Sequence, residues 1–275
     1  MFESPRFAAQ SPVARVGQLI GGVTLSQRHL KRGIIELAFL AALYVGYSAS
    51  RLLASNDFQA SRGRAVKILN FEETWRIAVE KPLNNFFARV DVVGLLGSFW
   101  YATTHYVVTV GVLMWLYRRN ATQYVTARRA LVVATVIGLT FYLLIPTAPP
   151  RLIDGAYIDI LNHHAQAGWW GADASAPRGL GGLTNELAAM PSLHAGWALW
   201  VVLVCIRARV RKVFQHLAIL YAVMTTIVIV GTANHWLLDA VVGWMVVGAG
   251  FALVLVWEKR SPVTAHEELV DYEFN

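Results

Sequence analysis

The residues with the clearest capacity for chemistry are His235 and Asp239, in the run TANHWLLD at positions 232–239. Residues four positions apart lie on one face of a helix, so the carboxylate can accept the Nδ1–H of the imidazole. The other ring nitrogen, Nε2, is then free to act as a nucleophile. An ionisable pair one turn inside an apolar segment is costly, which favours a functional site over a purely structural His–Asp pair. Asn234 is a natural N-cap for this helix.

A second motif, AAMPSLHAGWAL at 188–199, combines an anion site with a proton donor. Pro191 suits the first turn of a helix, where free N–H groups and the helix dipole favour an anion. Ser192 adds a hydroxyl, and His194 follows within one turn as a group that can hand over a proton. Taken alone, such a motif is more often a helix cap with an interfacial histidine, so its meaning depends on the other motifs.

The third motif, PTAPPR at 146–151, ends in an arginine whose direction is restricted by three prolines. The guanidinium of Arg151 suits bidentate contact with phosphate. An isolated arginine in this place would more often extend to the membrane surface. Together, however, the three motifs supply a cation, an anion site with an acid, and a nucleophile with its orienting carboxylate, which are the parts that phosphoryl transfer needs.

The segments that carry these motifs are predicted to be membrane helices. Hydrophobic residues make up 56% of the 275 and charged residues 15%, with a mean hydropathy of +0.46, whereas a soluble domain carries about 25% charged residues. The single cysteine, Cys205, excludes an intrachain disulfide and a cysteine-based metal site. Six segments reach or approach the roughly 20 apolar residues that a hydrocarbon core requires: Gly33–Leu53, Val92–Leu116, Ala130–Pro146, Met190–Ile206, Phe214–Thr232 and His235–Trp257.

The predicted fold class is therefore all-α, a polytopic membrane protein with a six-transmembrane-helix bundle at 33–257. A basic N-terminal segment at 1–32 and a polar tail at 258–275 flank it, both in the cytoplasm. Between the first two spans, apolar residues recur at helical spacing over Phe71–Arg89. Because charged residues such as Glu72 and Glu80 interleave with them, this segment is predicted to be an interfacial amphipathic helix. Thr103, Thr104 and His105 leave room for a tilt or a break within Val92–Leu116.

The distribution of positive charge predicts the orientation of the bundle. Most of the 24 Lys and Arg residues fall in the N-terminal segment and at the ends of the spans that a cytoplasmic N-terminus places inside. The net charge of +7 is then explained by topology and by anionic lipid head groups, so no nucleic acid partner is expected. The three motifs converge at the opposite level. We expect an integral plasma (inner) membrane protein whose active site faces the extracytoplasmic side.

The order and separation of these motifs resemble the phosphatidic acid phosphatase type 2 superfamily. The chain looks closest to the branch that includes fungal inositol phosphorylceramide synthase (an inositolphosphotransferase) and many actinobacterial membrane proteins. The resemblance spans roughly 33–257 and is carried by PTAPPR (146–151), AAMPSLHAGWAL (188–199) and TANHWLLDAVVG (232–243), with YATTH (101–105) as a weaker match.

The resemblance implies a role for each motif residue. By that resemblance, His235 is the nucleophile that forms a phosphohistidine, Asp239 orients it, and His194 protonates the leaving group. Ser192 and Arg151 hold the phosphate. No metal and no cofactor are implied. Two further residues of the YATTH run are candidates for the same cavity, Tyr101 and His105, although a structural hydrogen bond to a neighbouring helix explains His105 equally well.

Some family positions are different in this chain. Leu144 stands where the family has a lysine, and Val228 and Ile229 stand where it has Ser-Arg. Two of three expected phosphate-binding cations are thus missing, which favours the synthase-like branch, and Arg178 is the candidate replacement. His163 and His164, with Asp154 and Asp159, suggest a metal site, but adjacent histidines in a polar loop are usually without a function, so none is expected.

The sequence therefore predicts a membrane enzyme that acts on a phosphoester or pyrophosphate of a lipid. The acceptor is either water, which makes it a phosphatase, or a hydroxyl, which makes it a head-group phosphotransferase. The alternative is a non-catalytic lipid-phosphate binding or transport protein that retains the pocket; an oriented nucleophile, which binding alone does not need, counts against it. The identity of the lipid stays open.

Overall fold

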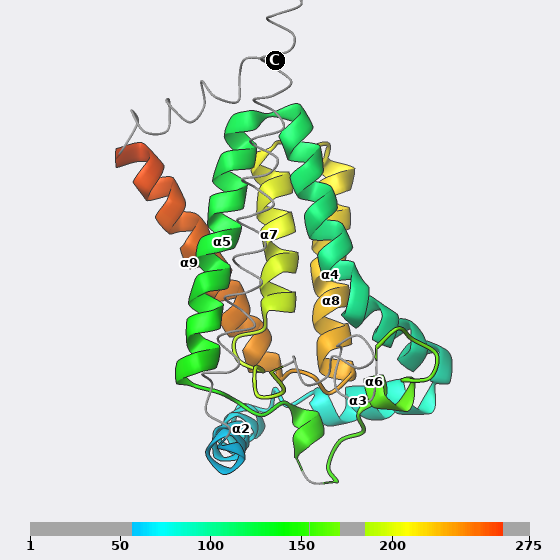
Figure 1. Ribbon diagram of the computed structural model, residues 1–275. Coiled ribbons are helices and arrows are strands. Elements are labelled where there is room, and N and C mark those ends of the chain that lie inside the picture. Colours follow the sequence, from blue (N-terminus) through cyan, green and yellow to red (C-terminus); the bar gives the residue numbers. More distant parts are fainter. Residues whose placement is uncertain (1–56, 154, 171–184, 261–275) are drawn as a thin grey trace, which may run out of the picture. The chain divides into compact units, whose positions relative to one another are not determined.

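The computed structural model describes residues 57–153, 155–170 and 185–260, and the described chain is predominantly helical (Figure 1). The N-terminal segment at 1–32, the expected first span Gly33–Leu53, the candidate cation Arg178 and most of the polar tail lie outside these residues. The described residues all belong to one compact unit, 50–275.

Five long helices form a bundle: α4 (Asp91–Arg119), α5 (Ala121–Leu144), α7 (Leu193–Arg207), α8 (Lys212–Gly231) and α9 (Leu237–Arg260). The α5 helix packs against α9, and α7 packs against both α8 and α9, while α4 contacts α5, α7 and α8 (Figure 1). Each corresponds to one predicted span. The all-helical class is confirmed for the described residues.

The observed helices differ from the predicted spans mainly at their ends. The α5 helix begins at Ala121 rather than Ala130, because the side chain of Asn120 accepts a hydrogen bond from Gln123 N at 2.8 Å and caps it. Arg129, which resembles a loop residue in the sequence, lies inside α5 and pairs with Glu258 of α9 at 3.3 Å. The α4 helix runs without a break past His105.

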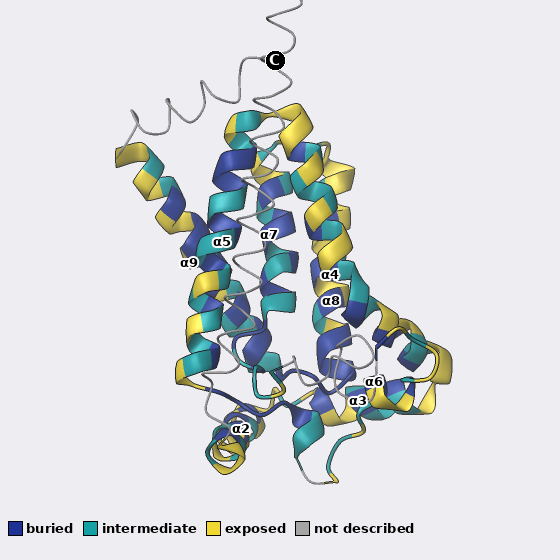
Figure 2. Cartoon of the chain, in the orientation of Figure 1, coloured by how far each residue is buried: buried dark blue, intermediate teal, exposed yellow. Residues whose placement is uncertain are grey.

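The bundle has the size and surface of a membrane protein. Three of the described helices, α5, α8 and α9, are long and apolar enough to cross a membrane, and α7 is apolar but has only 15 residues. The outward sides of α4 and α8 expose large apolar side chains such as Val107, Met114 and Leu220 (Figure 2). Such surfaces are stable against lipid and unfavourable in water, so the chain is an integral membrane protein.

The predicted amphipathic helix at Phe71–Arg89 is wrong in its extent, because two helices share that segment. The α2 helix (Phe58–Thr74) is followed by its C-cap Trp75, Arg76 has a φ of 56°, and α3 covers Glu80–Arg89. Glu72 and Glu80, expected to face water, are fully buried. Together with the short helices η1 (Pro150–Leu152) and α6 (Ile160–His163), α2 and α3 lie at the end of the bundle where α7 and α9 begin (Figure 1).

Candidate active site

The beginnings of α7 and α9 are joined directly by their backbones. Ser192 N donates to the carbonyl oxygen of Asp239 at 2.8 Å. This approach requires glycine one turn further along α9, because a Cβ at Gly243 would overlap the carbonyl of Ser192. Two motifs that are separated by some 40 residues therefore meet at one level of the bundle.

The contact brings two predicted site histidines together. The ring centroids of His194 and His235 lie 5.7 Å apart, with an interplanar angle of 58°. One ring comes from the first turn of α7 and the other from the loop that leads into α9. Two imidazoles at this separation can flank one phosphorus atom, one as a nucleophile and one as an acid.

The hydrogen-bond partner of His235 differs in part from the predicted one. Nδ1 lies 2.9 Å from the carbonyl oxygen of Ala189 and 3.5 Å from Oδ2 of Asp239. The same Oδ2 accepts the backbone N–H of Trp236 at 2.8 Å. A carbonyl can only accept, so Nδ1 carries the proton and Nε2 carries the lone pair. The carbonyl of Ala189 thus sets the tautomer, and the carboxylate of Asp239 lies behind it.

His194 is surrounded by aromatic rings from α4. Tyr101 stacks on it at a centroid distance of 4.3 Å, and the ring of His105 meets it at 4.1 Å. Nε2 of His194 is buried and has no hydrogen-bond partner among the described residues. Tyr101 and His105 therefore do face the predicted site, and they hold the ring of His194 by contact while leaving one nitrogen available.

Ser192 caps α7 and is fully buried. Its Oγ accepts a hydrogen bond from Ala195 N at 3.3 Å. The helix starts at Leu193, so Pro191 precedes the cap and does not occupy the first helical position, contrary to the sequence-based prediction. The carbonyl of Pro191 instead accepts the hydroxyl proton of Tyr142 at 2.7 Å. The Ser192 hydroxyl still carries a hydrogen that it can donate to an anion.

Arg151 lies against the loop that carries His235. Its Nη1 donates to Oδ1 of Asn234 at 2.8 Å, and its backbone N–H donates to the carbonyl of Ala233 at 2.9 Å. Asp159 pairs with Nε at 3.4 Å, and the side chain of Arg151 is only 5% exposed. Asn234 is therefore a partner of Arg151 rather than the predicted N-cap. The guanidinium is preorganised beside the loop that carries His235.

Two carboxylates that sequence reasoning placed on a surface helix cap α9. Glu80 Oε1 accepts Leu237 N–H at 2.8 Å, and Glu72 Oε1 accepts Leu238 N–H at 2.7 Å. Asp239, Glu80 and Glu72 thus bind three consecutive backbone amides of one helix start. Burial, aided by the neighbouring Glu80 carboxylate, raises the pKa of Glu72 to about 8. The sequence offered no signal for this contact, since it joins residues more than 150 positions apart.

A further cation near the site was also missed. Arg64 of α2 donates from Nε to the carbonyl of Pro146 at 2.6 Å, at the beginning of the PTAPPR run. At the two positions where the resemblance leads one to expect cations, Leu144 is 74% exposed, whereas Ile229 is buried in the core, as is its neighbour Val228. Among the described residues, the positive charge at this end therefore comes from other positions.

Comparison with known families identifies the class of the protein. The family model of the PAP2 superfamily matches residues 66–253, which is more than half of the chain. The chain therefore belongs to the PAP2 superfamily, and phosphatase or phosphotransferase activity is the activity that this membership suggests. Searches of curated proteins and of solved structures found no match.

Proposed function

We propose that the protein is a metal-independent lipid phosphatase or lipid head-group phosphotransferase that works through a phosphohistidine on His235. The observation that carries the proposal is the close pair of imidazoles. The ring centroids of His194 and His235 lie 5.7 Å apart, and a backbone carbonyl orients His235 so that Nε2 bears a lone pair. A purely structural pair needs neither feature.

The proposed reaction has two transfers. Nε2 of His235 attacks phosphorus and forms an N–P bond, while the P–O bond to the lipid breaks and the leaving oxygen takes a proton from His194. The acceptor, water or a hydroxyl, then gives a proton to His194 and attacks phosphorus, which releases His235. The carboxylate of Asp239, 3.5 Å from Nδ1, stabilises the positive charge that develops on the ring.

In this proposal, charged and polar side chains bind the phosphate of the substrate, and the apolar helix surfaces bind its lipid chains. Arg151 holds the phosphate together with the hydroxyl of Ser192, and Arg178 is the proposed additional cation. The lipid chains lie against the apolar helices, with the phosphate at the polar end where α7 and α9 begin. We place that end on the extracytoplasmic side of the plasma membrane, because of the distribution of Lys and Arg. The resemblance to inositol phosphorylceramide synthase favours transfer to a polyol.

The proposal is tested by trapping the intermediate. Purified protein is mixed with a lipid phosphate labelled on phosphorus, quenched, and examined for an acid-labile, base-stable phosphoryl group on His235. We expect label on the wild type and on the control H216A, whose histidine is exposed on α8, and none on H235A. Turnover of every lipid phosphate should fall at least about 10³-fold in H235A. A variant that keeps wild-type turnover would refute the nucleophile assignment.

A non-catalytic lipid-phosphate binder is the second candidate, and the apolar residues at positions 144, 228 and 229 favour it. Such a protein would bind lipid phosphate without acquiring label. Trapping therefore separates the two candidates, since only an enzyme forms the N–P bond.

Hydrolase and transferase are separated by the products. Lipid phosphates and diphosphates are supplied with and without a polyol such as inositol, and both free phosphate and new phospholipid are measured. A transferase should form a polyol phosphate product at the expense of free phosphate. If free phosphate is released at the same rate whether or not polyol is present, the protein is a phosphatase.

A further inference from the structure

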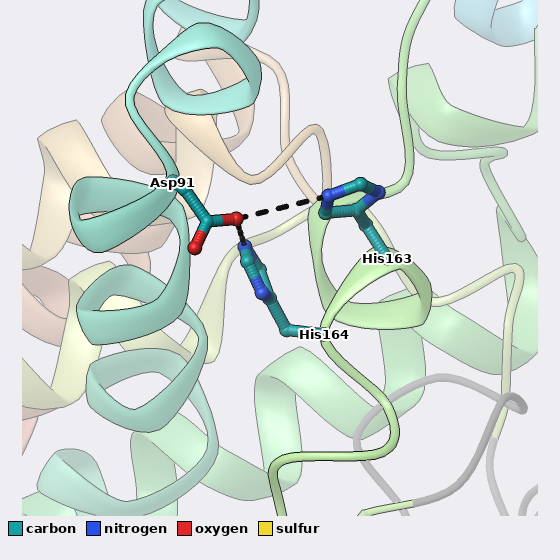
Figure 3. A group of neighbouring side chains, drawn as sticks. All are labelled: Asp91, His163 and His164. Carbon is teal, nitrogen blue, oxygen red and sulfur yellow. Dashed lines mark ion pairs between the residues drawn. The ribbon is translucent and has the colours of Figure 1, made fainter.

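A second group of histidines lies apart from the proposed active site. His163 and His164, at the end of α6, point toward Asp91 in the first turn of α4 (Figure 3). Nε2 of each imidazole lies 3.9 Å from Oδ1 of Asp91. One ligand atom from each of the three residues lies within 4.8 Å of the other two. None of the three belongs to the group around His235.

These separations fit a shared ion better than hydrogen bonds. A hydrogen bond between an imidazole and a carboxylate spans about 2.7–3.2 Å, so 3.9 Å is too long for either histidine. Zinc with bonds of about 2.0–2.1 Å holds its tetrahedral ligand atoms about 3.3 Å apart. The three ligand atoms lie within 4.8 Å of one another, so side-chain rotations that shorten their separations by up to about 1.5 Å would bring both nitrogens and the oxygen to that spacing. Two imidazoles and one carboxylate are also a ligand set that zinc prefers.

The turn that carries the histidines is held firmly in place. Asp159 caps α6 by accepting Asn162 N–H at 3.0 Å, and the indole of Trp170 donates to the carbonyl of Leu161 at 2.9 Å. His164 is only 8% exposed, and its ring is seated against Gly94 of α4, where a Cβ would lie 2.8 Å from Nε2. One ligand is therefore positioned by packing.

The other two ligands lie at the surface. The side chains of Asp91 and His163 are 77% and 56% exposed. An ion can therefore enter from water, and three protein ligands leave a fourth position of a tetrahedral site for a water molecule.

We propose that Asp91, His163 and His164 bind a zinc ion that fastens the α6 turn to the beginning of α4. The turn buries Ile160 and Leu161 in the same apolar cluster as Tyr101, the ring that stacks on His194. The ion therefore stabilises the outer support of the active site and takes no part in phosphoryl transfer.

The test measures zinc and stability without any substrate. The full chain, carrying a tag free of histidine, is purified in detergent, stripped with a chelator, dialysed and titrated with ZnCl2. We expect about one tightly bound zinc per chain and a rise of the unfolding temperature on zinc addition. Replacing Zn²⁺ by Co²⁺ should produce the visible absorption of a four-coordinate site.

The variants D91N and H163A alter exposed side chains, so both should fold. Each should bind zinc at least about 10-fold more weakly and lose most of the thermal shift. The matched controls E73Q and H216A, an exposed carboxylate and an exposed histidine elsewhere, should behave like the wild type. Absence of stoichiometric zinc in the wild type would overturn the site, as would unchanged affinity in D91N or H163A. Because no substrate is used, this result is independent of the outcome for His235.

Discussion

The molecule holds two groups of histidines that differ in how their nitrogens are used. In the buried group, the rings of His194 and His235 lie 5.7 Å apart, and Nδ1 of His235 lies 2.9 Å from a backbone carbonyl oxygen. In the second group, in which Asp91 and His163 are exposed and His164 is buried, both histidines direct Nε2 at one oxygen of Asp91. The same residue types are thus arranged for different chemistry.

The carboxylates explain most of this difference. Around the buried group, the carboxylates of Asp239, Glu80 and Glu72 accept hydrogen bonds from backbone amides at the start of α9. They are therefore not placed between two histidine rings. In the second group, Oδ1 of Asp91 faces the rings of both His163 and His164. A histidine that keeps one ring nitrogen without a hydrogen-bond partner can react through it. Two histidines whose ring nitrogens point at the same carboxylate can instead hold an ion together with it. The comparison teaches that the neighbours of the ring, rather than its burial alone, separate the two roles.

The largest effect that sharpens this comparison is expected for H194A. Loss of the acid should slow turnover of a lipid with an alkoxide leaving group by about 10²–10⁴-fold. An activated aryl phosphate, whose leaving group needs no proton, should be affected much less. Turnover of both substrates is measured for the wild type, H194A and the control H216A. Equal losses on both substrates would contradict the role of His194 as the acid.

The next effect is expected for G243A, which disturbs only the buried group. The added methyl group collides with the carbonyl of Ser192 and separates the beginnings of α7 and α9. Overpacking of this kind costs about 1–3 kcal/mol of stability, and misplacement of the two histidines should reduce turnover by about 100-fold. Thermal unfolding and turnover are measured together, with G248A as the control, where a Cβ meets nothing within 4 Å. Wild-type turnover in G243A would show that the spacing of the pair is unimportant.

A smaller effect is expected for R151K. Lysine keeps the positive charge but loses the planar fork that Asn234 and Asp159 hold in place. We expect KM for a lipid phosphate to rise about 10-fold while kcat changes less. Steady-state kinetics of R151K check this, with R119K as the control, because Arg119 is the last residue of α4. A fall in kcat alone would indicate that Arg151 acts in the chemical step instead.

The smallest effect is expected for E72Q, and it appears as a pH dependence of stability. The pKa of Glu72 is raised from its ordinary value of 4.5 to about 8, so between these values the folded chain holds a proton that the unfolded chain has lost. The free energy of unfolding of the wild type therefore decreases as the pH rises through this window, by at most about 1.4 kcal/mol per pH unit. The glutamine side chain does not titrate in this pH range, so the free energy of unfolding of E72Q should depend less on pH. Unfolding temperatures from pH 5 to pH 8 check it, and E73Q should keep the wild-type slope.

Much of the helical framework could be predicted from apolar length alone. Five predicted spans correspond to α4, α5, α7, α8 and α9, because a run of apolar residues is readable without knowledge of its neighbours. Helix ends were less predictable. Arg129 suggests a loop until its partner Glu258 is known, and Asn234 suggests a cap until its hydrogen bond to Arg151 is seen.

The site residues were predictable to the extent that they stand in short motifs. Three short sequence motifs contain His194, His235, Asp239 and Arg151, and the residue types and spacing of each motif indicate its chemistry. The structure brings these three motifs together. Their catalytic roles remain predictions, and Arg178 lies outside the described residues. Asp91 was not associated with His163 and His164, because some 70 residues of chain separate them and no local spacing connects them.

The sequence by itself determined that this chain is helical and apolar, and which three motifs carry reactive groups. Both properties are local, since apolar runs and spacings of three or four residues act within a few turns. Only the tertiary structure decided that the carboxylates of Glu72 and Glu80 are buried against α9. Glu72 and Glu80 have the same side chain as any surface glutamate, and their burial against α9 follows from how α2 and α3 pack. A contact between distant segments depends on the whole packed arrangement, which no single stretch of sequence specifies.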